Sequence, residues 1–223
     1  MIHFDNLSKR YPGGDEALKS ISLHMDVGEL AFLTGHSGAG KSTLLKLLML
    51  MERPTSGALL INGTNINRLT NSKIPSYRRQ LGVVFQDHQL LMDRSVYDNV
   101  ALPLQVAGQS RKETGRRVRA ALDAVGLLSK ERHSPMMLSG GEQQRVGIAR
   151  AVVHKPRILL ADEPTGNLDS KSGHEIMGIL NQLYEDGNTI ILVTHEDDIA
   201  QHARRIIRLF DGKIIEDSEI KGK

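Results

Sequence analysis

One glycine-rich stretch ends in a lysine and a serine and has the spacing of a phosphate-binding loop. It reads Gly35-x-x-x-x-Gly40-Lys41-Ser42, with an apolar segment before it and a helical pattern after it, which is the context that a P-loop requires. The glycines allow backbone N–H groups to surround phosphates, the Lys41 ammonium neutralises their charge, and the Ser42 hydroxyl can bind Mg²⁺. The following helix directs its N-terminus toward the same anion. The stretch therefore predicts a nucleotide-binding site.

Two adjacent carboxylates follow a second apolar segment. Asp162 and Glu163 come directly after "RILLA", so one carboxylate can bind the metal ion while the next polarises water. In phosphoryl transfer, positioning and charge neutralisation supply most of the catalysis, and one group must orient the attacking water. We predict that Asp162 binds the metal and that Glu163 orients the water. The alternative is an ordinary turn at a strand end, before Pro164.

Two more polar side chains follow apolar segments, namely Gln86 after "LGVVF" and His195 after "IILVT". A lone Gln or His at the end of a strand is more often structural than functional. In an open parallel sheet, however, ligands bind outside the carboxyl ends of the strands, and both residues are expected there. Gln86 can contact Mg²⁺ or the attacking water, and His195 can hydrogen-bond the γ-phosphate.

A further stretch, "LSGGEQQR" from Leu138 to Arg145, places two glycines at the start of a helical pattern. Such a cap leaves backbone N–H groups bare at a helix N-terminus, where the helix dipole favours an anion. Ser139, Gly140 and Gly141 therefore predict a second phosphate site. The alternative, for this stretch taken alone, is a polar turn that caps a surface helix.

The elements that position these groups are short strands and helices. "AFLT", "ILLAD" and "IILVT" are continuously apolar, which is typical of strands buried on both faces of a parallel sheet. Early strands such as "ISLHMDV" alternate and follow one another without helices, which favours a small antiparallel sheet, and "FDGKII" carries the Asp-Gly signal of a hairpin. The remaining predicted strands are "IHF", "ALLI", "LGVVF" and "RIIRLF".

Helical patterns alone fill the interval from Phe85 to Arg157. The predicted fold is therefore α/β: one domain, 1–223, whose core carries an antiparallel β subdomain and an inserted α-helical subdomain at approximately 87–156.

The composition fits a globular protein. The chain has 223 residues, 39% of them hydrophobic, and no apolar run reaches the ~18 residues that a membrane span needs. Cysteine is absent and the nine histidines lack ligand spacing, which excludes disulfides and thiolate metal sites. A net charge of +3 does not predict nucleic-acid binding, and the basic run at 110–119 lacks aromatics for stacking bases. For this run we favour a solvated helix face over contact with anionic lipid.

Together these motifs resemble one family, the ATP-binding cassette (ABC) ATPases, over essentially the whole chain. "LSGGEQQR" is similar to the family's signature motif, Gln86 to its Q-loop, "GNLD" to its D-loop and His195 to its switch histidine. The resemblance implies a RecA-like P-loop NTPase core, ATP and Mg²⁺ as cofactors, catalytic roles for Gln86, Glu163 and His195, and Mg²⁺ contacts from Ser42, Gln86 and Asp162. The nucleotide-binding residues that it implies are Tyr11, which stacks on adenine, then Gly35, His36, Ser37, Gly38, Ala39, Gly40, Lys41, Ser42 and Thr43 of the P-loop, and Ser139, Gly140 and Gly141.

The family's architecture implies a reason for two phosphate sites in one chain. Two cassettes pack head to tail, so that Ser139, Gly140 and Gly141 of one chain complete the phosphate shell at the P-loop of the other. The chain has one P-loop and one signature motif. A homodimer with two composite ATP sites is the simplest assembly.

The branch of the family is indicated by two stretches. "ADEPTGNLD" resembles the branch of lipoprotein-releasing, macrolide-type and cell-division cassettes, and "FQDHQLLMDRSVYDNVALPL" is most similar to the cell-division members. This implies a peripheral ATPase on the cytoplasmic face of the bacterial inner membrane, with an integral membrane partner and other division proteins, that couples ATP turnover to peptidoglycan hydrolysis. Leu90, Leu91 and Met92 are candidates for docking that partner or, alternatively, for packing inside the helical part. Leu50 and Met51 stand where relatives often have a glycine, and Glu196 stands where Asp is usual.

Two alternatives share the ATP chemistry. One is a transporter cassette for lipoprotein release or efflux. The other is a soluble cassette protein of DNA repair or translation, although such proteins typically add coiled-coil arms, zinc modules or a second cassette. The start "MIHFDNLSKR" lacks the pattern of a secretory signal, so we expect the protein to stay in the compartment where it is made.

Overall fold

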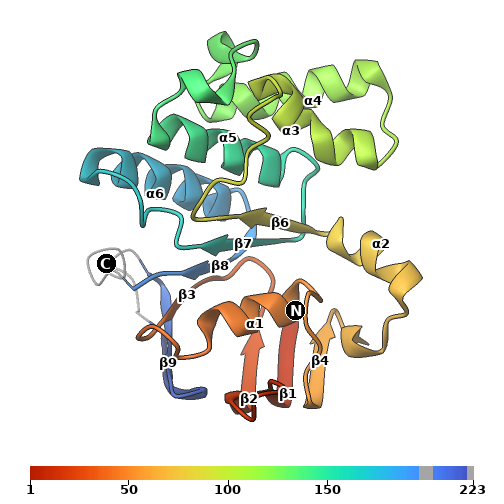
Figure 1. Ribbon diagram of the computed structural model, residues 1–223, viewed down its shortest axis with the longest axis vertical. Coiled ribbons are helices and arrows are strands. Elements are labelled where there is room, and N and C mark those ends of the chain that lie inside the picture. The colour runs from red at the N-terminus through yellow and green to blue at the C-terminus, as the bar shows by residue number, and fades with distance from the viewer. Residues whose placement is uncertain (196–202, 220–223) are drawn as a thin grey trace. The chain divides into compact units, whose positions relative to one another are not determined.

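The computed structural model describes residues 1–195 and 203–219. Their contacts divide the chain into two compact units, one formed by residues 1–78 and 187–223 and the other by residues 79–186 (Figure 1). Within the described ranges, none of the helices combines the length and the apolar character that a membrane-spanning helix needs.

The first unit contains an antiparallel sheet with the strand order β2-β1-β4-β5. Its strands are β1 (Ile2–Arg10), β2 (Glu16–Met25), β4 (Ser56–Ile61) and the two-residue β5 (Thr64–Asn65). Ile2 pairs with Met25 and Phe4 with Leu23, and these side chains are buried on one face, as the alternation of the sequence predicts. The predicted antiparallel β part is therefore confirmed, with β5 as an addition.

The same unit contains four strands of a second sheet, in the order β10-β9-β3-β8. β3 (Leu30–Thr34) pairs in parallel with both β8 (Thr189–Val193) and β9 (Arg205–Phe210). β9 and β10 (Lys213–Glu219) form an antiparallel hairpin in which Phe210 pairs with Lys213 across Asp211-Gly212. The structure confirms both the parallel strands and the predicted hairpin.

Helix α1 (Lys41–Leu48) follows β3 and buries Leu44, Leu45, Leu47 and Leu48. Just beyond the helix, Leu50 has a left-handed φ of 52°, and the N–H of Met51 donates to Lys46 O. This is the geometry of a Schellman cap, in which a glycine is usual. Leu50 is nevertheless a leucine because its side chain is buried. The chain then passes through the 3₁₀ turns η1 (Ile66–Arg68) and η2 (Asn71–Lys73) into α2 (Ile74–Arg78).

The second unit contains two parallel strands, β6 (Leu81–Val84) and β7 (Ile158–Asp162). Between them the structure has only helices: α3 (Val96–Val106), α4 (Arg111–Ala124), η3 (Leu128–Lys130), η4 (Pro135–Met137) and α5 (Gly140–Val152). Helix α6 (Ser170–Glu185) follows β7. The predicted α/β class is confirmed, whereas a helical subdomain at 87–156 stays a prediction, because this unit also includes β6, β7 and α6.

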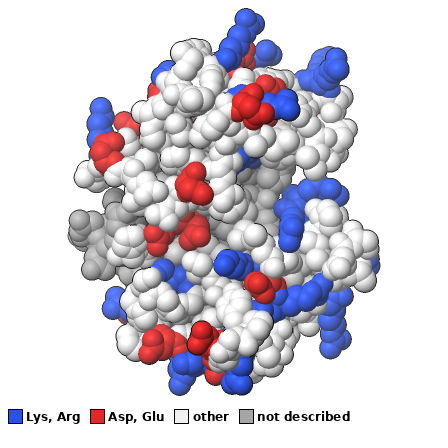
Figure 2. Space-filling model, in the orientation of Figure 1, with Lys and Arg blue, Asp and Glu red and all other residues white. Residues whose placement is uncertain are grey.

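The basic run at 110–119 forms the first part of α4. Glu113 forms ion pairs with Arg116 and Arg117, and Arg119 pairs with Glu131. Hydrogen bonds from Arg116 and Arg117 lower the pKa of Glu113 to about 2. Acidic groups accordingly lie among basic ones on the helical part of this unit (Figure 2). This arrangement supports a solvated, ion-paired helix face.

Candidate functional site

The glycines of the P-loop are required by the backbone that surrounds it. Gly35 has a φ of 141°, and a methyl group there would lie 2.2 Å from Leu209 O of β9. Gly40 has a φ of 110°, and its methyl group would lie 2.6 Å from Ala17 O of β2. Gly38 has open space around it but a φ of 82°, so its conformation alone favours glycine. The first unit thus fixes the loop by close packing on two neighbouring strands.

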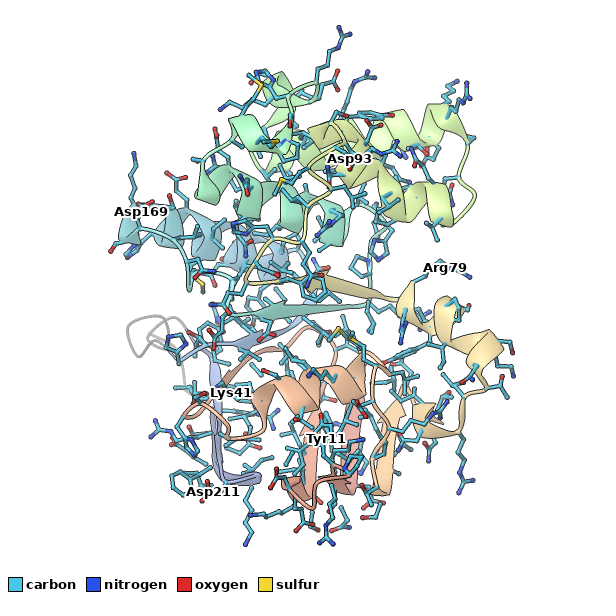
Figure 3. The ribbon with its side chains drawn as sticks, in the orientation of Figure 1. Tyr11, Lys41, Arg79, Asp93, Asp169 and Asp211 are labelled. Carbon is cyan, nitrogen blue, oxygen red and sulfur yellow. The ribbon has the colours of Figure 1, made fainter. Side chains whose placement is uncertain are left out.

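Lys41 lies at the start of α1 with its side chain folded into the loop (Figure 3). It is buried, and its ammonium donates to Gly35 O at 2.6 Å and His36 O at 3.1 Å. An ammonium has three donors, so a third remains for a phosphate. Helix α1 has no side-chain cap, and the described residues provide no acceptor for the N–H groups of Ser42 and Thr43. These donors converge where the sequence predicts phosphates.

The turn of the β9–β10 hairpin supports the P-loop, a contact that no local sequence pattern indicates. The N–H of Gly212 donates to Ala39 O at 3.0 Å. The edge of the His36 ring contacts Phe210, with 4.9 Å between centroids, and His36 Nε2 lies 3.4 Å from Asp211 Oδ1. The Asp-Gly pair signals a hairpin in the sequence, but nothing local shows what the hairpin contacts.

Tyr11, the predicted adenine-stacking residue, lies just beyond β1. The Lys9 ammonium lies 4.9 Å from the centroid of the Tyr11 ring, within the range of a cation–π contact. Lys9 is in turn held by hydrogen bonds to the Glu52 carboxylate and to Arg53 O. The ring is thereby fixed at the end of β1, a strand that lies between β2 and β4 in the antiparallel sheet.

His195 follows β8 at the same sheet edge as the P-loop. Leu33 of β3 pairs in parallel with Val193 of β8, so Gly35 and His195 each stand two residues beyond this pair. The predicted position of the histidine at a carboxyl strand end is confirmed, and its catalytic role stays a prediction. The neighbouring Glu196 lies outside the described residues.

In the second unit, Gln86 and Glu163 come together. Val84 of β6 pairs in parallel with Ala161 of β7, so both side chains emerge at the same carboxyl edge, next to Asp162. A methyl group on Gly166 would lie 3.0 Å from Gln86 Nε2 and 3.5 Å from Glu163 Oε2. The structure therefore brings two of the predicted catalytic side chains to one place, beside the glycine of the D-loop.

Glu163 has a φ of 45°, a left-handed conformation that costs a non-glycine residue about 1–2 kcal/mol. Such a conformation persists only where the surrounding structure holds it, and it is frequent at functional sites. It turns the chain sharply at the end of β7, toward Pro164. The strain is thus consistent with the predicted role of the carboxylate.

The signature helix α5 begins with a capping box. Ser139 Oγ accepts from the N–H of Glu142, and the Glu142 carboxylate accepts from the N–H of Ser139. The expectation of a bare helix end is therefore corrected in part: of the N–H groups in the first turn of α5, those of Gly140 and Gly141 have no acceptor among the described residues, whereas that of Glu142 has one. The Lys130 ammonium pairs with the Glu142 carboxylate and lowers its pKa.

The two glycines of this helix end differ in their surroundings. A methyl group on Gly141 would lie 2.8 Å from Ser172 Oγ in α6, whereas one on Gly140 would lie 3.5 Å from Leu168 Cδ2. Gly141 is therefore required by packing within the unit. Gly140 is not required by such packing, and its role toward a phosphate stays a prediction.

The loop after Gln86 is held by a residue that belongs to none of the sequence motifs. Arg150 of α5 donates to His88 O at 2.7 Å and to Gln89 O at 2.6 Å, and burial lowers its pKa. His88 and Gln89 both have positive φ values, so the loop has a specific, strained shape that α5 maintains.

These sites and this fold define the class of the protein. The model of the ABC transporter family matches residues 18–166, and the chain belongs to that family. It is an ABC-type ATPase that binds a nucleotide, as its motifs predict.

Individual relatives are more specific. The chain is 54% identical over 215 residues to the cell division ATP-binding protein FtsE of Escherichia coli (strain K12), covering 96% of the chain and 97% of the relative. It is 43% identical over 222 residues to the macrolide export ATP-binding/permease protein MacB of Sodalis glossinidius (strain morsitans), covering 98% of the chain and 34% of the relative.

Among solved structures, the bacterial ABC transporter cassette MJ0796 matches with a TM-score of 0.90 and 38% identity over 100% of both chains. One such structure is dimeric, and another is a dimeric post-hydrolysis state bound to ADP and Pi.

Proposed function

We propose that the chain is the ATPase subunit of a membrane complex of cell division and acts with an FtsX-like integral membrane partner. ATP-driven homodimerisation is coupled to the activation of peptidoglycan hydrolysis across the inner membrane, and the chain is peripheral on the cytoplasmic face. The observation that carries this proposal is the 54% identity to FtsE over nearly the whole of both chains.

ATP is bound and hydrolysed by residues of both units. Tyr11 stacks on adenine, the residues Gly35 to Thr43 bind the phosphates, and His195 hydrogen-bonds the γ-phosphate. Glu163 orients the attacking water, and its place beside Gln86 next to Gly166 supports this role. The assignment of both sets of residues to one nucleotide rests on the family.

Mg²⁺ would be held by Ser42, Gln86 and Asp162, an assignment that rests on the family. Their hydroxyl, amide and carboxylate oxygens are the hard ligands that this cation prefers, and Gln86 and Asp162 both emerge at the carboxyl edge of β6 and β7. When bound, the cation neutralises charge that develops on the phosphates. Ser42 is exposed at the first turn of α1, where a metal bound to phosphates can reach it.

The signature end of α5 serves the nucleotide of a second chain. The N–H groups of Gly140 and Gly141, together with the Ser139 hydroxyl, supply donors to its phosphates. The dimeric structures of MJ0796, at 38% identity, support this assembly.

The membrane partner docks on the loop after Gln86. Leu91 and Met92 are 41% and 43% exposed, whereas Leu90 is 8% exposed and belongs to the core. The Asn99 amide fixes Leu91, because its Oδ1 accepts from the Leu91 N–H and its Nδ2 donates to the Leu91 carbonyl. An apolar, fixed surface of this kind suits a protein partner.

The test is to purify the native protein from membranes and identify the integral protein that comes with it. A division partner, together with filamentous cells on depletion, supports the proposal. The similarity to MacB favours an efflux cassette as the second candidate, and in that case depletion raises macrolide sensitivity while division continues. Leu91→Ser with Met92→Ser should abolish copurification at an unchanged melting temperature.

A further inference from the structure

A buried glutamine in α5 joins the three predicted functional segments of the second unit. Gln144 is fully buried. Its Nε2 donates to Pro164 O at 2.8 Å and to Phe85 O at 3.3 Å, and its Oε1 lies 2.5 Å from His88 Nδ1. Phe85 precedes Gln86, and Pro164 follows Glu163. One side chain thus contacts the neighbours of both residues that meet beside Gly166.

The chemistry of these bonds requires an amide at position 144. Backbone carbonyls only accept hydrogen bonds, so the amide nitrogen must face Phe85 and Pro164 and uses both its donors there. The amide oxygen then faces His88, whose Nδ1 must carry a proton in order to donate. A carboxylate lacks the donors, and an apolar side chain lacks both functions.

The segments that Gln144 holds are strained and depend on external contacts. Glu163, His88 and Gln89 have φ values of 45°, 59° and 46°. Non-glycine residues keep such conformations only where their surroundings impose them. Helix α5 imposes them at two points, through Gln144 and through the bonds from Arg150 to the carbonyls of His88 and Gln89.

We propose that Gln144 is a positioning residue for hydrolysis. It ties the signature helix to the Gln86 loop and to the Glu163 turn, so that the seating of the Ser139–Gly141 end on a phosphate sets the geometry of Gln86 and Glu163. The inference rests on the proposed function, because it assumes that Glu163 acts in ATP hydrolysis.

Asn99 provides a matched control for Gln144. It is also a fully buried amide of the second unit with three hydrogen bonds, to the N–H and the carbonyl of Leu91 and to Ser95 O. None of these bonds involves Phe85 or Pro164. Gln144→Met and Asn99→Leu each replace a buried amide by an apolar side chain of similar shape, so the two variants lose comparable numbers of contacts.

The experiment measures the melting temperature, the affinity for ATP and the turnover number of both variants. We expect both melting temperatures to fall by comparable amounts, roughly 2–10 °C, with ATP affinity within about twofold of the wild type because the P-loop is unchanged. Only Gln144→Met should lower turnover, by about tenfold or more, since misplacing a reacting group by 1 Å can cost ~10²-fold. Equal turnover of the two variants, per folded molecule, would overturn the proposal.

His88→Ala provides a gentler variant if Gln144→Met does not fold. It removes the partner of the amide oxygen and leaves the two donations to carbonyls intact, so turnover should fall about threefold without loss of ATP affinity. In the double variant His88→Ala, Gln144→Met the losses should not add, because both substitutions break one network. Additive losses, or unchanged turnover in His88→Ala, would contradict the proposed network.

Glu163→Gln separates this inference from the proposed function. If Glu163→Gln retains wild-type turnover, the proposed role of Glu163 is wrong and Gln144 has nothing to position. If Glu163→Gln is inactive while Gln144→Met turns over like Asn99→Leu, only the inference about Gln144 is wrong.

Discussion

Helices α1 and α5 both have glycine at their N-terminal ends, as the cap of α1 and as the first residues of α5, yet the two ends are built differently. Gly40 caps α1 in a left-handed conformation without a side-chain hydrogen bond. Ser139 caps α5 with a complete capping box. The first turn of α1 contains no acidic residue, whereas that of α5 contains Glu142. One helix end therefore depends on an external acceptor, and the other supplies an acceptor of its own.

The glycines at the two helix ends also differ in how tightly their surroundings enclose them. Gly35 and Gly40 are required by carbonyls of β9 and β2 only 2.2 and 2.6 Å from where a methyl group would lie. At Gly140 the nearest atom would be 3.5 Å away. The P-loop is thus shaped by its own unit before it meets a ligand. The N-terminus of α5 is capped by its own residues, so it does not need a phosphate in order to be stable.

The largest expected effect concerns neither helix end, because two phosphate sites can bind ATP without hydrolysing it. Glu163→Gln should lower ATP hydrolysis by ~10²-fold or more, the scale of losing a positioned base. ATP binding and ATP-dependent dimerisation should persist, since glutamine keeps the shape of the side chain. Phosphate release and light scattering measure the two properties. Turnover near the wild type would remove Glu163 from the mechanism.

The next effect distinguishes which chain each helix end serves. Lys41→Ala damages the P-loop, and Gly140→Asp places a like charge at the predicted phosphate seat, where 3.5 Å to Leu168 Cδ2 leaves room for a side chain. Each homodimer then has two damaged sites. In a mixed dimer with shared sites, both defects fall into one site and the other is intact, so mixing should restore ATP-dependent association.

Association by light scattering is the readout for this mixture, because coupling between sites can silence hydrolysis. The melting temperatures of both variants control for folding. If heterodimers form and the mixture associates no better than its components, each chain uses its own signature, and the second helix end does not serve a neighbour.

A smaller effect tests why the glycines are present. Gly40→Ala should lower the free energy of unfolding by ~1–3 kcal/mol or more, because of its φ of 110° and the close Ala17 carbonyl. Gly140→Ala should change it by less than about 1 kcal/mol, since alanine is favoured over glycine in a helix. Thermal unfolding without nucleotide measures both. Equal losses would show that the two ends are shaped by the same kind of packing.

Much of this architecture follows from local patterns in the sequence. The apolar strands predicted β3, β7 and β8, and the residues at their ends are those that the parallel pairing brings to common edges. Turn chemistry likewise predicted the Asp211-Gly212 hairpin. Such features depend on a few neighbouring residues, which is why one sequence suffices.

What the sequence did not reveal depends on contacts between distant segments or on backbone strain. The Ser139-x-x-Glu142 spacing is that of a capping box, so this cap is an exception that the sequence does encode locally. Gln144 carries no signal within a helical pattern, because its three partners come from loops far along the chain. The left-handed conformation of Glu163 cannot be predicted from the sequence either, because glutamate normally avoids positive φ values.

The smallest expected effect is the pH dependence of the signature cap. The hydrogen bond from Lys130 is the main cause that lowers the pKa of Glu142 in the folded protein. A depressed pKa means that the stabilisation is fully present above the unfolded value, near 4.3, and is lost as the pH falls through the folded value. Glu142→Gln should therefore lower the free energy of unfolding by about 0.5–1 kcal/mol at pH 7, and the difference should vanish under acid conditions.

Glu113→Gln is the matched control, because Glu113 occupies the same position after Ser110 in α4 and also has a lowered pKa. Arg116, one of the two ion-pair partners of Glu113, is 72% exposed, whereas Lys130, the partner of Glu142, is 36% exposed. Added salt should therefore screen the contribution of Glu113 more than that of Glu142. Chemical denaturation of the three proteins between pH 3 and 7, at low and high salt, measures both effects. Helix α1 has no acidic residue in its first turn, so its N-terminus makes no comparable pH-dependent contribution to the free energy of unfolding. If the loss in free energy of unfolding on Glu142→Gln stays constant down to pH 3, the Glu142 side chain stabilises α5 through its hydrogen-bonding shape and not through its charge. The N-termini of α1 and α5 would then differ less in their electrostatics than their caps suggest.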